Sequence, residues 1–188
     1  MLQEAGFDPR RAEFDVDDDS LVEAVGGVEA ACLARAWFKV CAAISVLTAR
    51  DDVDAAPGVV LAADTLCESE GRLVGKPSNA DEARRMIRSL SDCEHRTLTG
   101  VAIIDLHDDL RSIWSDSTRV RIGHLQDQEI DAYVETGAWQ GKSGGYNLSD
   151  RIEAGWPIRI EGDPTTVMGL PMRRLAPQLR SLLSKGLV

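Results

Sequence analysis

The segment from Val59 to Pro77, VVLAADTLCESEGRLVGKP, constrains the fold more than any other part of the chain. It begins with an apolar run of β-forming residues directly after Pro57-Gly58, a pattern that predicts a buried strand. The run ends at Ala63-Asp64-Thr65, so we expect a carboxylate and a hydroxyl at the exit of the strand. Glu70-Gly71 predicts a hairpin turn, and a return strand then leads into Gly75-Lys76-Pro77.

This hairpin would allow Asp64 and Lys76 to face each other. A carboxylate can hold a metal ion or activate water, and an ammonium group can neutralise phosphate oxygens, so the segment is a candidate site for a metal-bound phosphate. The alternative is structural. Asp-Thr after a strand is common in caps and turns, Lys-Pro is common in loops, and no spacing in this segment is diagnostic by itself.

Length and charge limit the classes of protein to consider. A chain of 188 residues can form one sizeable domain and is short for two, so we expect a single α/β domain over residues 1–188. The formal net charge of −10 repels a nucleic-acid backbone, so we expect no nucleic-acid partner. No apolar run reaches the roughly 20 residues of a membrane span, and the start lacks a signal-peptide pattern. We therefore predict a cytoplasmic protein without a membrane partner.

Helical periodicity runs from Val28 to Thr48 and includes Lys39, which by itself would be an ordinary solvated residue. A second helix is expected from Asn79 to Leu90, with Asn79 as its cap and Glu82 completing the cap. We expect further strands over residues 95–106, 112–122 and 158–160, a helix over 126–135, a turn at Asp163-Pro164, and a C-terminal helix containing Leu175, Leu179 and Leu182.

Three other features have both a functional and a structural interpretation. The glycine-rich stretch from Gly137 to Tyr146 presents Lys142 among residues whose N–H groups can approach an anion, although most glycine loops are turns. Asp17-Asp18-Asp19 can supply oxygen ligands to a divalent ion or form a solvated acidic loop. The four cysteines show no CxxC spacing, which favours free thiols over a zinc site.

Several stretches, in this order, resemble the Maf (septum-formation) family of nucleoside triphosphate pyrophosphatases. They are Ala34-Arg35-Ala36 followed by Lys39, then VVLAADT, LVGKP, NADEARRMIRSLSDCEHRTLTGVAI, STRVRI, GKSGGYNLSD and VMGLPM. The resemblance covers about Asp17 to Leu183. It implies a mixed, twisted, elongated sheet with helices on both faces, similar to the inosine-triphosphatase-like fold. It also implies a hydrolase that converts a nucleoside triphosphate to the monophosphate and pyrophosphate with Mg²⁺ or Mn²⁺. Family members are often homodimers, so the resemblance also suggests a homodimer.

The resemblance also assigns roles to individual residues. Asp64 corresponds to the catalytic carboxylate, and Lys39 and Lys76 correspond to the phosphate-facing lysines. The substrate-binding positions are Thr65, Lys142, Gly145 and Ser149. The metal-associated acids are Asp64 and Asp19, with Asp18 as the alternative to Asp19. A triphosphate carries about four negative charges, so its hydrolysis requires a metal and several ammonium groups around an oriented water.

The sequence departs from the family pattern in three places. The family opens with a strand and a Ser-x-Ser-Pro-Arg-Arg phosphate loop, whereas Met1–Phe7 matches the helix after that loop, and Arg10-Arg11 is not equivalent to the motif. This predicts either a start further upstream or a protein without the loop. Ser149 stands where the family tends to have Gln, and Asp19 replaces a longer Glu.

These departures keep two alternatives to an active enzyme open. The first is a catalytically impaired nucleotide-binding protein that regulates cell division, and the second is an interaction module that uses only the fold. Two features indicate a preference for a nucleotide base, and they point to different branches of the family. Thr65 after Asp64 resembles the branch that prefers dTTP and UTP, whereas Asp163-Pro164 resembles the 7-methyl-GTP branch; we favour the pyrimidine branch.

Overall fold

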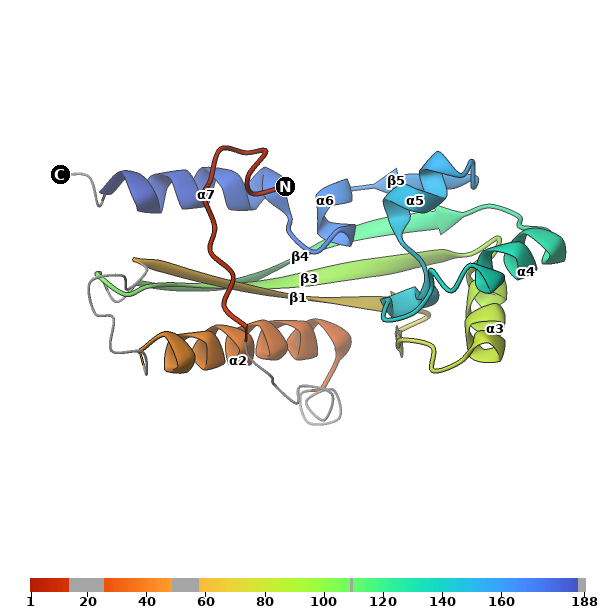
Figure 1. Cartoon of the computed structure of the whole chain (residues 1–188), viewed down its shortest axis with the longest axis horizontal. Coiled ribbons are helices and arrows are strands. Elements are labelled where there is room, and N and C mark those ends of the chain that lie inside the picture. The colour runs from red at the N-terminus through yellow and green to blue at the C-terminus, as the bar shows by residue number, and fades with distance from the viewer. Residues whose placement is uncertain (14–25, 49–57, 109, 186–188) are drawn as a thin grey trace. The chain divides into compact units, whose positions relative to one another are not determined.

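The computed structural model describes residues 1–13, 26–48, 58–108 and 110–185 (Figure 1). Its α-helices are α2 (Val28–Thr48), α3 (Ala80–Leu90), α4 (Asp127–Glu135), α5 (Leu148–Glu153), α6 (Pro164–Val167) and α7 (Met172–Lys185), with a short 3-10 helix η2 (Ser143–Gly145). Its strands are β1 (Val59–Ser69), β2 (Arg72–Val74), β3 (Glu94–Asp105), β4 (Leu110–Ile122) and β5 (Ile158–Glu161).

The strands form one five-stranded sheet with the order β2-β1-β3-β4-β5. The pairs β1–β2 and β4–β5 are antiparallel. The N–H of Leu106, just after β3, donates to the carbonyl of Gly58, just before β1, at 2.7 Å. A bond between those two ends makes β1 and β3 antiparallel as well. The predicted α/β class is confirmed.

The chain divides into two compact units, and each is described by itself. Unit 1 contains residues 1–64, 99–116 and 169–188, and unit 2 contains residues 65–98 and 117–168. Three strands, β1, β3 and β4, contribute residues to both units. The expectation of a single domain over residues 1–188 therefore stays a prediction.

In unit 1, successive side chains of a strand alternate between two buried faces. Val60 and Ala62 of β1 and Ala102 and Ile104 of β3 share one hydrophobic cluster with α2. The α2 residues of that cluster that are fully or almost fully buried are Ala36, Val40 and Ala43. The residues on this face therefore have even numbers in both strands, because side chains on one face of a strand recur at every second residue.

The odd-numbered residues of the same strands pack against α7. Val59, Leu61 and Ala63 of β1 join Val101 and Ile103 of β3 in a second cluster. Its fully or almost fully buried α7 residues are Leu175, Leu179 and Leu182, which the sequence pattern predicted as the buried stripe. Helices thus cover both faces of this part of the sheet, with α2 on one side and α7 on the other (Figure 1), which confirms the predicted layering.

Helix α2 is long and apolar enough, by length and composition alone, to cross a membrane, with a mean hydropathy of 1.6 over its most apolar window. A single such helix near the N-terminus is weak support for a span, because the core helices of water-soluble proteins meet the same criterion. One face of α2 packs against β1 and β3. That packing is what a core helix requires.

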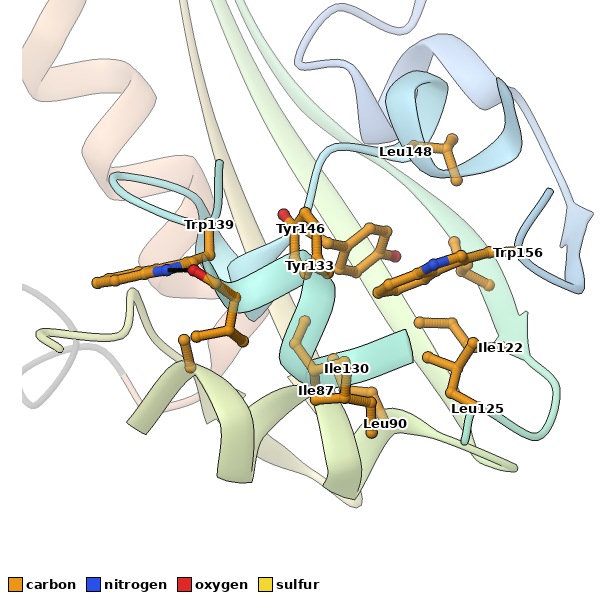
Figure 2. Packing of buried hydrophobic residues seen from close by; sticks show 13 residues of the cluster. Ile87, Leu90, Ile122, Leu125, Ile130, Tyr133, Trp139, Tyr146, Leu148 and Trp156 are labelled. Atoms are coloured by element: carbon orange, nitrogen blue, oxygen red, sulfur yellow. Dashed lines mark hydrogen bonds between the residues drawn. The ribbon is translucent and has the colours of Figure 1, made fainter. Parts of the chain in front are cut away.

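Unit 2 has its own hydrophobic core, which Figure 2 shows from close by. It is built by α3, α4, the later part of β4 and the segment around α5. Its aromatic members are Tyr133, Trp139, Tyr146 and Trp156. The rings of Tyr133 and Trp156 meet edge to face, with 5.2 Å between their centroids. This core holds the loop described below.

The prediction that the first strand ends at Asp64-Thr65 is wrong. β1 continues to Ser69, and Leu66 and Cys67 are buried. The last three residues of β1 pair with β2 through the predicted turn, where Glu70 and Gly71 both have positive φ. Positive φ at both central residues is the requirement of a tight type I′ hairpin.

Two local predictions also need correction, and one helix was not predicted. Asn79 caps α3 as expected by accepting a hydrogen bond from Glu82 N, but the Glu82 side chain returns to Ser78 rather than to Asn79. Asp163-Pro164 is the start of α6, with Asp163 as its N-cap, rather than a free turn. The six-residue helix α5 was not predicted. It begins after Asn147, whose side chain accepts from Asp150 N.

Candidate functional site

In unit 1, Asp64 and Lys39 form an ion pair. Asp64 is an even-numbered residue of β1, so strand alternation turns its side chain to the face that α2 covers. Lys39 lies on α2, and its Nζ donates to Oδ1 of Asp64. Asp64 is only 9% exposed and Lys39 is 28% exposed. The structure therefore brings these two predicted site residues together although they are far apart in sequence.

The second carboxylate oxygen of Asp64 is left for another partner. Oδ2 is buried and accepts no hydrogen bond from the residues that the structure describes. A buried anionic oxygen without a partner is costly, so it indicates a ligand, a water or a cation. Mg²⁺ is commonly held by one or two carboxylates together with substrate phosphates, and the donor chemistry of Asp64 fits that pattern.

The predicted second metal-associated residue, Asp19, lies outside the described residues. Within the ranges that the structure covers, no group of three or more His, Cys, Asp or Glu side chains is arranged to hold a metal ion. Of the two predicted metal-associated residues, Asp64 is therefore the one within the described ranges.

In unit 2, two predicted phosphate-binding segments are in contact. We call residues Gly137 to Tyr146 the glycine loop. The N–H of Gly144 in this loop donates to the carbonyl of Gly75 at 3.0 Å, next to Lys76. Gly144 and Gly145 both have positive φ (75° and 72°), a conformation that glycine adopts without steric cost. The loop is therefore built on a backbone that requires these glycines.

Two aromatic side chains fix the glycine loop from its own unit. The hydroxyl of Tyr133, on α4, donates to the carbonyl of Gly145 at 3.0 Å. The hydroxyl of Tyr146 lies 2.6 Å from Nε2 of His95, on β3. Figure 2 shows both tyrosines within the core of this unit. The loop is thus held at two successive residues, which restricts the positions of its N–H groups.

Burial has a large effect on the titration of this His–Tyr pair. His95 is 2% exposed, and burial lowers its pKa from 6.5 to about 4, so the imidazole is neutral at physiological pH. Burial raises the pKa of the Tyr146 hydroxyl far above its ordinary value. The contact is therefore a hydrogen bond between neutral groups. Nδ1 of His95 has no hydrogen-bond partner among the described residues.

The remaining predicted site residues also lie in unit 2. Lys76 is exposed, and the buried Pro77 follows it. Lys142 is half-buried, and its Nζ donates to the carbonyl of Ala138 within the glycine loop. Ser149 is half-buried in the first turn of α5.

Thr65 is half-buried on β1. Because successive side chains of a strand point to opposite faces, the side chain of Thr65 points to the other face from that of Asp64. The functional roles assigned to Thr65, Lys76, Lys142, Gly145 and Ser149, and a convergence of the lysines on Asp64, stay predictions.

Four residues that contact the candidate site or hold its loop were not predicted from the sequence. They are Cys32, His95, Tyr133 and Tyr146. Each acts through a contact with a residue distant in sequence, and no local spacing marks such a contact. The one available signal was a histidine in a run of residues that predicts a strand, because a buried polar group usually has a hydrogen-bond partner.

Comparison with known proteins gives a consistent result. A family model described as "Maf-like protein" matches residues 1–182. The chain is 36% identical over 174 residues to the dTTP/UTP pyrophosphatase of Salinibacter ruber, covering 92% of this chain and 80% of that protein. It is 32% identical over 192 residues to a nucleoside triphosphate pyrophosphatase of Mycobacterium bovis, covering 98% and 84%. The match to the dTTP/UTP pyrophosphatase of Alkaliphilus oremlandii, at 38% identity, covers 65% of this chain and 63% of that protein.

Proposed function

Since the chain belongs to the Maf-like family, we propose that it hydrolyses a nucleoside triphosphate to the nucleoside monophosphate and pyrophosphate. The observation that carries the proposal is the state of Asp64. Its carboxylate is buried, one oxygen is paired with Lys39, and the other is left for a ligand. Similarity to proteins named dTTP/UTP pyrophosphatase supports dTTP or UTP as the substrate.

The chemistry follows from the charge of the substrate. A water oxygen forms a bond to the α-phosphorus, the bridging P–O bond breaks, and its electron pair leaves with pyrophosphate. Oδ2 of Asp64 is suited either to accept the proton of that water or to hold a metal ion. Lys39 fixes the orientation of the carboxylate through Oδ1. The lysine thereby keeps one oxygen of Asp64 occupied and the other directed at the reaction.

Mg²⁺ or Mn²⁺ would be held by Asp64 with Asp19, and would supply neutralisation of the phosphate oxygens. The glycine loop would bind phosphate through its N–H groups, with Lys142 and Gly145, and Lys76 would add positive charge. Thr65 and Ser149 would contact the nucleoside. A homodimer, a cytoplasmic location and a role in septum formation rest on the resemblance to the family and remain proposals.

Pyrophosphate release tests the proposal. The purified protein with Mg²⁺ or Mn²⁺ should convert dTTP or UTP to the monophosphate and pyrophosphate, and chromatography of the products distinguishes this from loss of the γ-phosphate alone. Asp64→Asn should reduce kcat by about 1,000-fold, the order of loss expected for a central catalytic group. Absence of release from every common and modified nucleoside triphosphate would overturn the proposal.

A matched control is Asp127→Asn. Asp127 forms an exposed ion pair with Arg88 on the surface of unit 2. Loss of this carboxylate should leave kcat within about twofold of the original protein, because exposed ion pairs contribute little. Equal losses for Asp64→Asn and Asp127→Asn would mean that Asp64 has no special role.

A further inference from the structure

A single thiol contacts the backbones of both β1 and β3 at the level of Asp64. Sγ of Cys32, on α2, donates to the carbonyl oxygen of Asp64 at 3.0 Å. The same sulfur accepts a hydrogen bond from the N–H of Gly100, on β3, at 2.9 Å. Cys32 is fully buried, and all three residues belong to unit 1. One side chain of α2 is therefore bonded to the backbones of two strands.

The register of the strands gives this position a specific meaning. The bond from Leu106 N to Gly58 O marks a hydrogen-bonded position of the antiparallel β1–β3 ladder, and such positions recur at every second residue. Asp64 lies six residues after Gly58, and Gly100 lies six residues before Leu106. The ladder therefore pairs Asp64 with Gly100. The Asp64 carbonyl and the Gly100 N–H therefore face each other in the ladder. Both of these groups also form a hydrogen bond with the sulfur of Cys32.

The same register continues beyond this point. Glu68 and Arg96, in unit 2, are directly opposite in it, and their side chains form an ion pair at 2.6 Å. The thiol therefore contacts one position of a ladder whose register is the same on both sides of that position.

Gly100 makes this contact sterically possible. A Cβ at position 100 would lie 2.5 Å from the carbonyl oxygen of Cys32 and 2.7 Å from its carbonyl carbon. The backbone of α2 therefore rests directly on β3 at a residue without a side chain. This close approach is what allows the short side chain of Cys32 to reach the backbones of the two strands.

We propose that Cys32 is a positioning residue for Asp64. It sets the main chain from which the carboxylate extends, and that carboxylate has a buried oxygen without a partner among the described residues. A displacement of about 1 Å in a reacting group can reduce the rate by about 100-fold, so the placement of this backbone matters for catalysis. The kinetic consequence rests on the proposed function, whereas the structural consequence does not.

The competing explanation is that Cys32 only fills space, as buried cysteines commonly do. Three substitutions separate the explanations. Cys32→Ala removes both hydrogen bonds, and Cys32→Ser keeps a donor and an acceptor. Cys32→Val fills the volume without either group, and it replaces Cys32→Ala if that variant does not fold. Cys41→Ala and Cys41→Ser are matched controls, because Cys41 is a half-buried free thiol on the same helix.

The first readout is steady-state kinetics of pyrophosphate release. Cys32→Ala should lower kcat by about tenfold or more with KM within about twofold, and Cys32→Ser should recover most of that loss. The Cys41 variants should leave kcat unchanged. A kcat for Cys32→Ala equal to that of the original protein, or equal losses in the Ala and Ser variants, would overturn the proposal.

The second readout needs no turnover. Backbone NMR of the full chain follows the two groups that the sulfur contacts, the carbonyl carbon of Asp64 and the amide of Gly100. Cys32→Ala or Cys32→Val should shift the Asp64 carbonyl signal and speed hydrogen exchange of the Gly100 amide, Cys32→Ser should largely restore both, and the Cys41 variants should change neither. If the original protein releases no pyrophosphate, the proposed function fails, and this measurement still tests the positioning role of Cys32. An unchanged Asp64 carbonyl signal together with unchanged Gly100 exchange in Cys32→Ala and Cys32→Val would overturn the positioning role.

Discussion

The backbone N–H of Gly144 donates a 3.0 Å hydrogen bond to the carbonyl oxygen of Gly75. This bond joins the glycine loop to the segment before Lys76, two stretches that are far apart in sequence. A Cβ placed on Gly145 would lie 3.4 Å from Pro77, so the two segments are also in van der Waals contact. Lys76 and Lys142 are therefore carried by one connected part of unit 2, as an anion-binding surface requires.

The first prediction concerns the shape of this loop. Gly145→Ala should destabilise the protein by about 1 kcal/mol, because an L-residue is strained at a φ of 72°. The added methyl group would also touch Pro77 at 3.4 Å and Ile87 at 3.5 Å, which shifts the loop. We expect KM for the nucleotide to rise at least about fivefold, in proportion to roughly 1 kcal/mol of lost substrate contact. Thermal unfolding and steady-state kinetics measure the two effects.

Gly155→Ala is the matched control for backbone strain. Gly155 has a similar φ of 82°, and a Cβ there would meet no atom within 4 Å. It should lose comparable stability while KM stays unchanged. A similar rise in KM in both variants would show that general destabilisation, and not the loop, limits substrate binding.

The second prediction concerns the partner of the buried carboxylate. Lys39→Met keeps the length of the side chain but removes its charge, so Asp64 Oδ1 loses its cation. We expect kcat to fall by about 100-fold or more, comparable to the loss of a group that stabilises transition-state charge. Stability should fall by about 2 kcal/mol, less than for a fully buried pair because Lys39 is 28% exposed.

Arg88→Met is the control for removal of a cation. Arg88 is half exposed and forms an exposed ion pair with Asp127. Its replacement should change stability by less than about 1 kcal/mol and leave kcat unchanged. A Lys39→Met variant with normal kcat would contradict the role proposed for the Lys39–Asp64 pair.

Much of the fold could be predicted from local patterns. The apolar stripe of α2 gave its observed bounds, Val28–Thr48, because a helix that packs on a sheet must present its apolar residues at three- and four-residue steps. The Glu70-Gly71 turn was predicted because few residue pairs adopt positive φ at both positions. These features depend on neighbours in the sequence, which is why the sequence specifies them.

The features that could not be predicted depend on tertiary contacts. A polar pair at Asp64-Thr65 normally marks the end of a strand, but here β1 continues because Lys39 compensates the charge of Asp64 from another element. The position of Asp64 on the α2 side follows from the even-numbered face of β1. Sequence alone does not say which face α2 covers. The short helix α5 is set mainly by the Asn147 cap and the burial of Leu148.

The third prediction is a pH dependence that arises from His95. Burial lowers its pKa in the folded protein to about 4, whereas an unfolded chain has the ordinary value of about 6.5. Between these values the unfolded state binds a proton that the folded state does not. The contribution of His95 to the free energy of unfolding is therefore complete above about pH 6.5 and is lost as pH falls to about 4. The loss is up to about 3 kcal/mol.

His95→Gln should flatten this part of the stability profile, because an amide does not titrate in this range. Denaturant unfolding at several pH values between 4 and 7 gives the profile. His124→Gln is the control, since His124 is exposed and contacts the exposed Asp92. A profile for His95→Gln with the same slope as the original protein would mean that other groups cause the acid sensitivity.

The fourth prediction concerns the close contact between the backbone of α2 at Cys32 and Gly100 of β3. Gly100→Ala would place a methyl group 2.5 Å from the carbonyl oxygen of Cys32, so α2 must move away from β3. We expect a loss of about 3 kcal/mol, at the upper end of what overpacking costs, since the clash is with backbone. Gly75→Ala is the control, because a Cβ there would meet nothing within 4 Å. In denaturant unfolding, Gly100→Ala should lower the transition midpoint far more than Gly75→Ala, with the slope of the transition unchanged. Equal midpoints in the two variants would contradict the close approach of α2 to β3, and with it the access of the thiol to the Asp64 backbone.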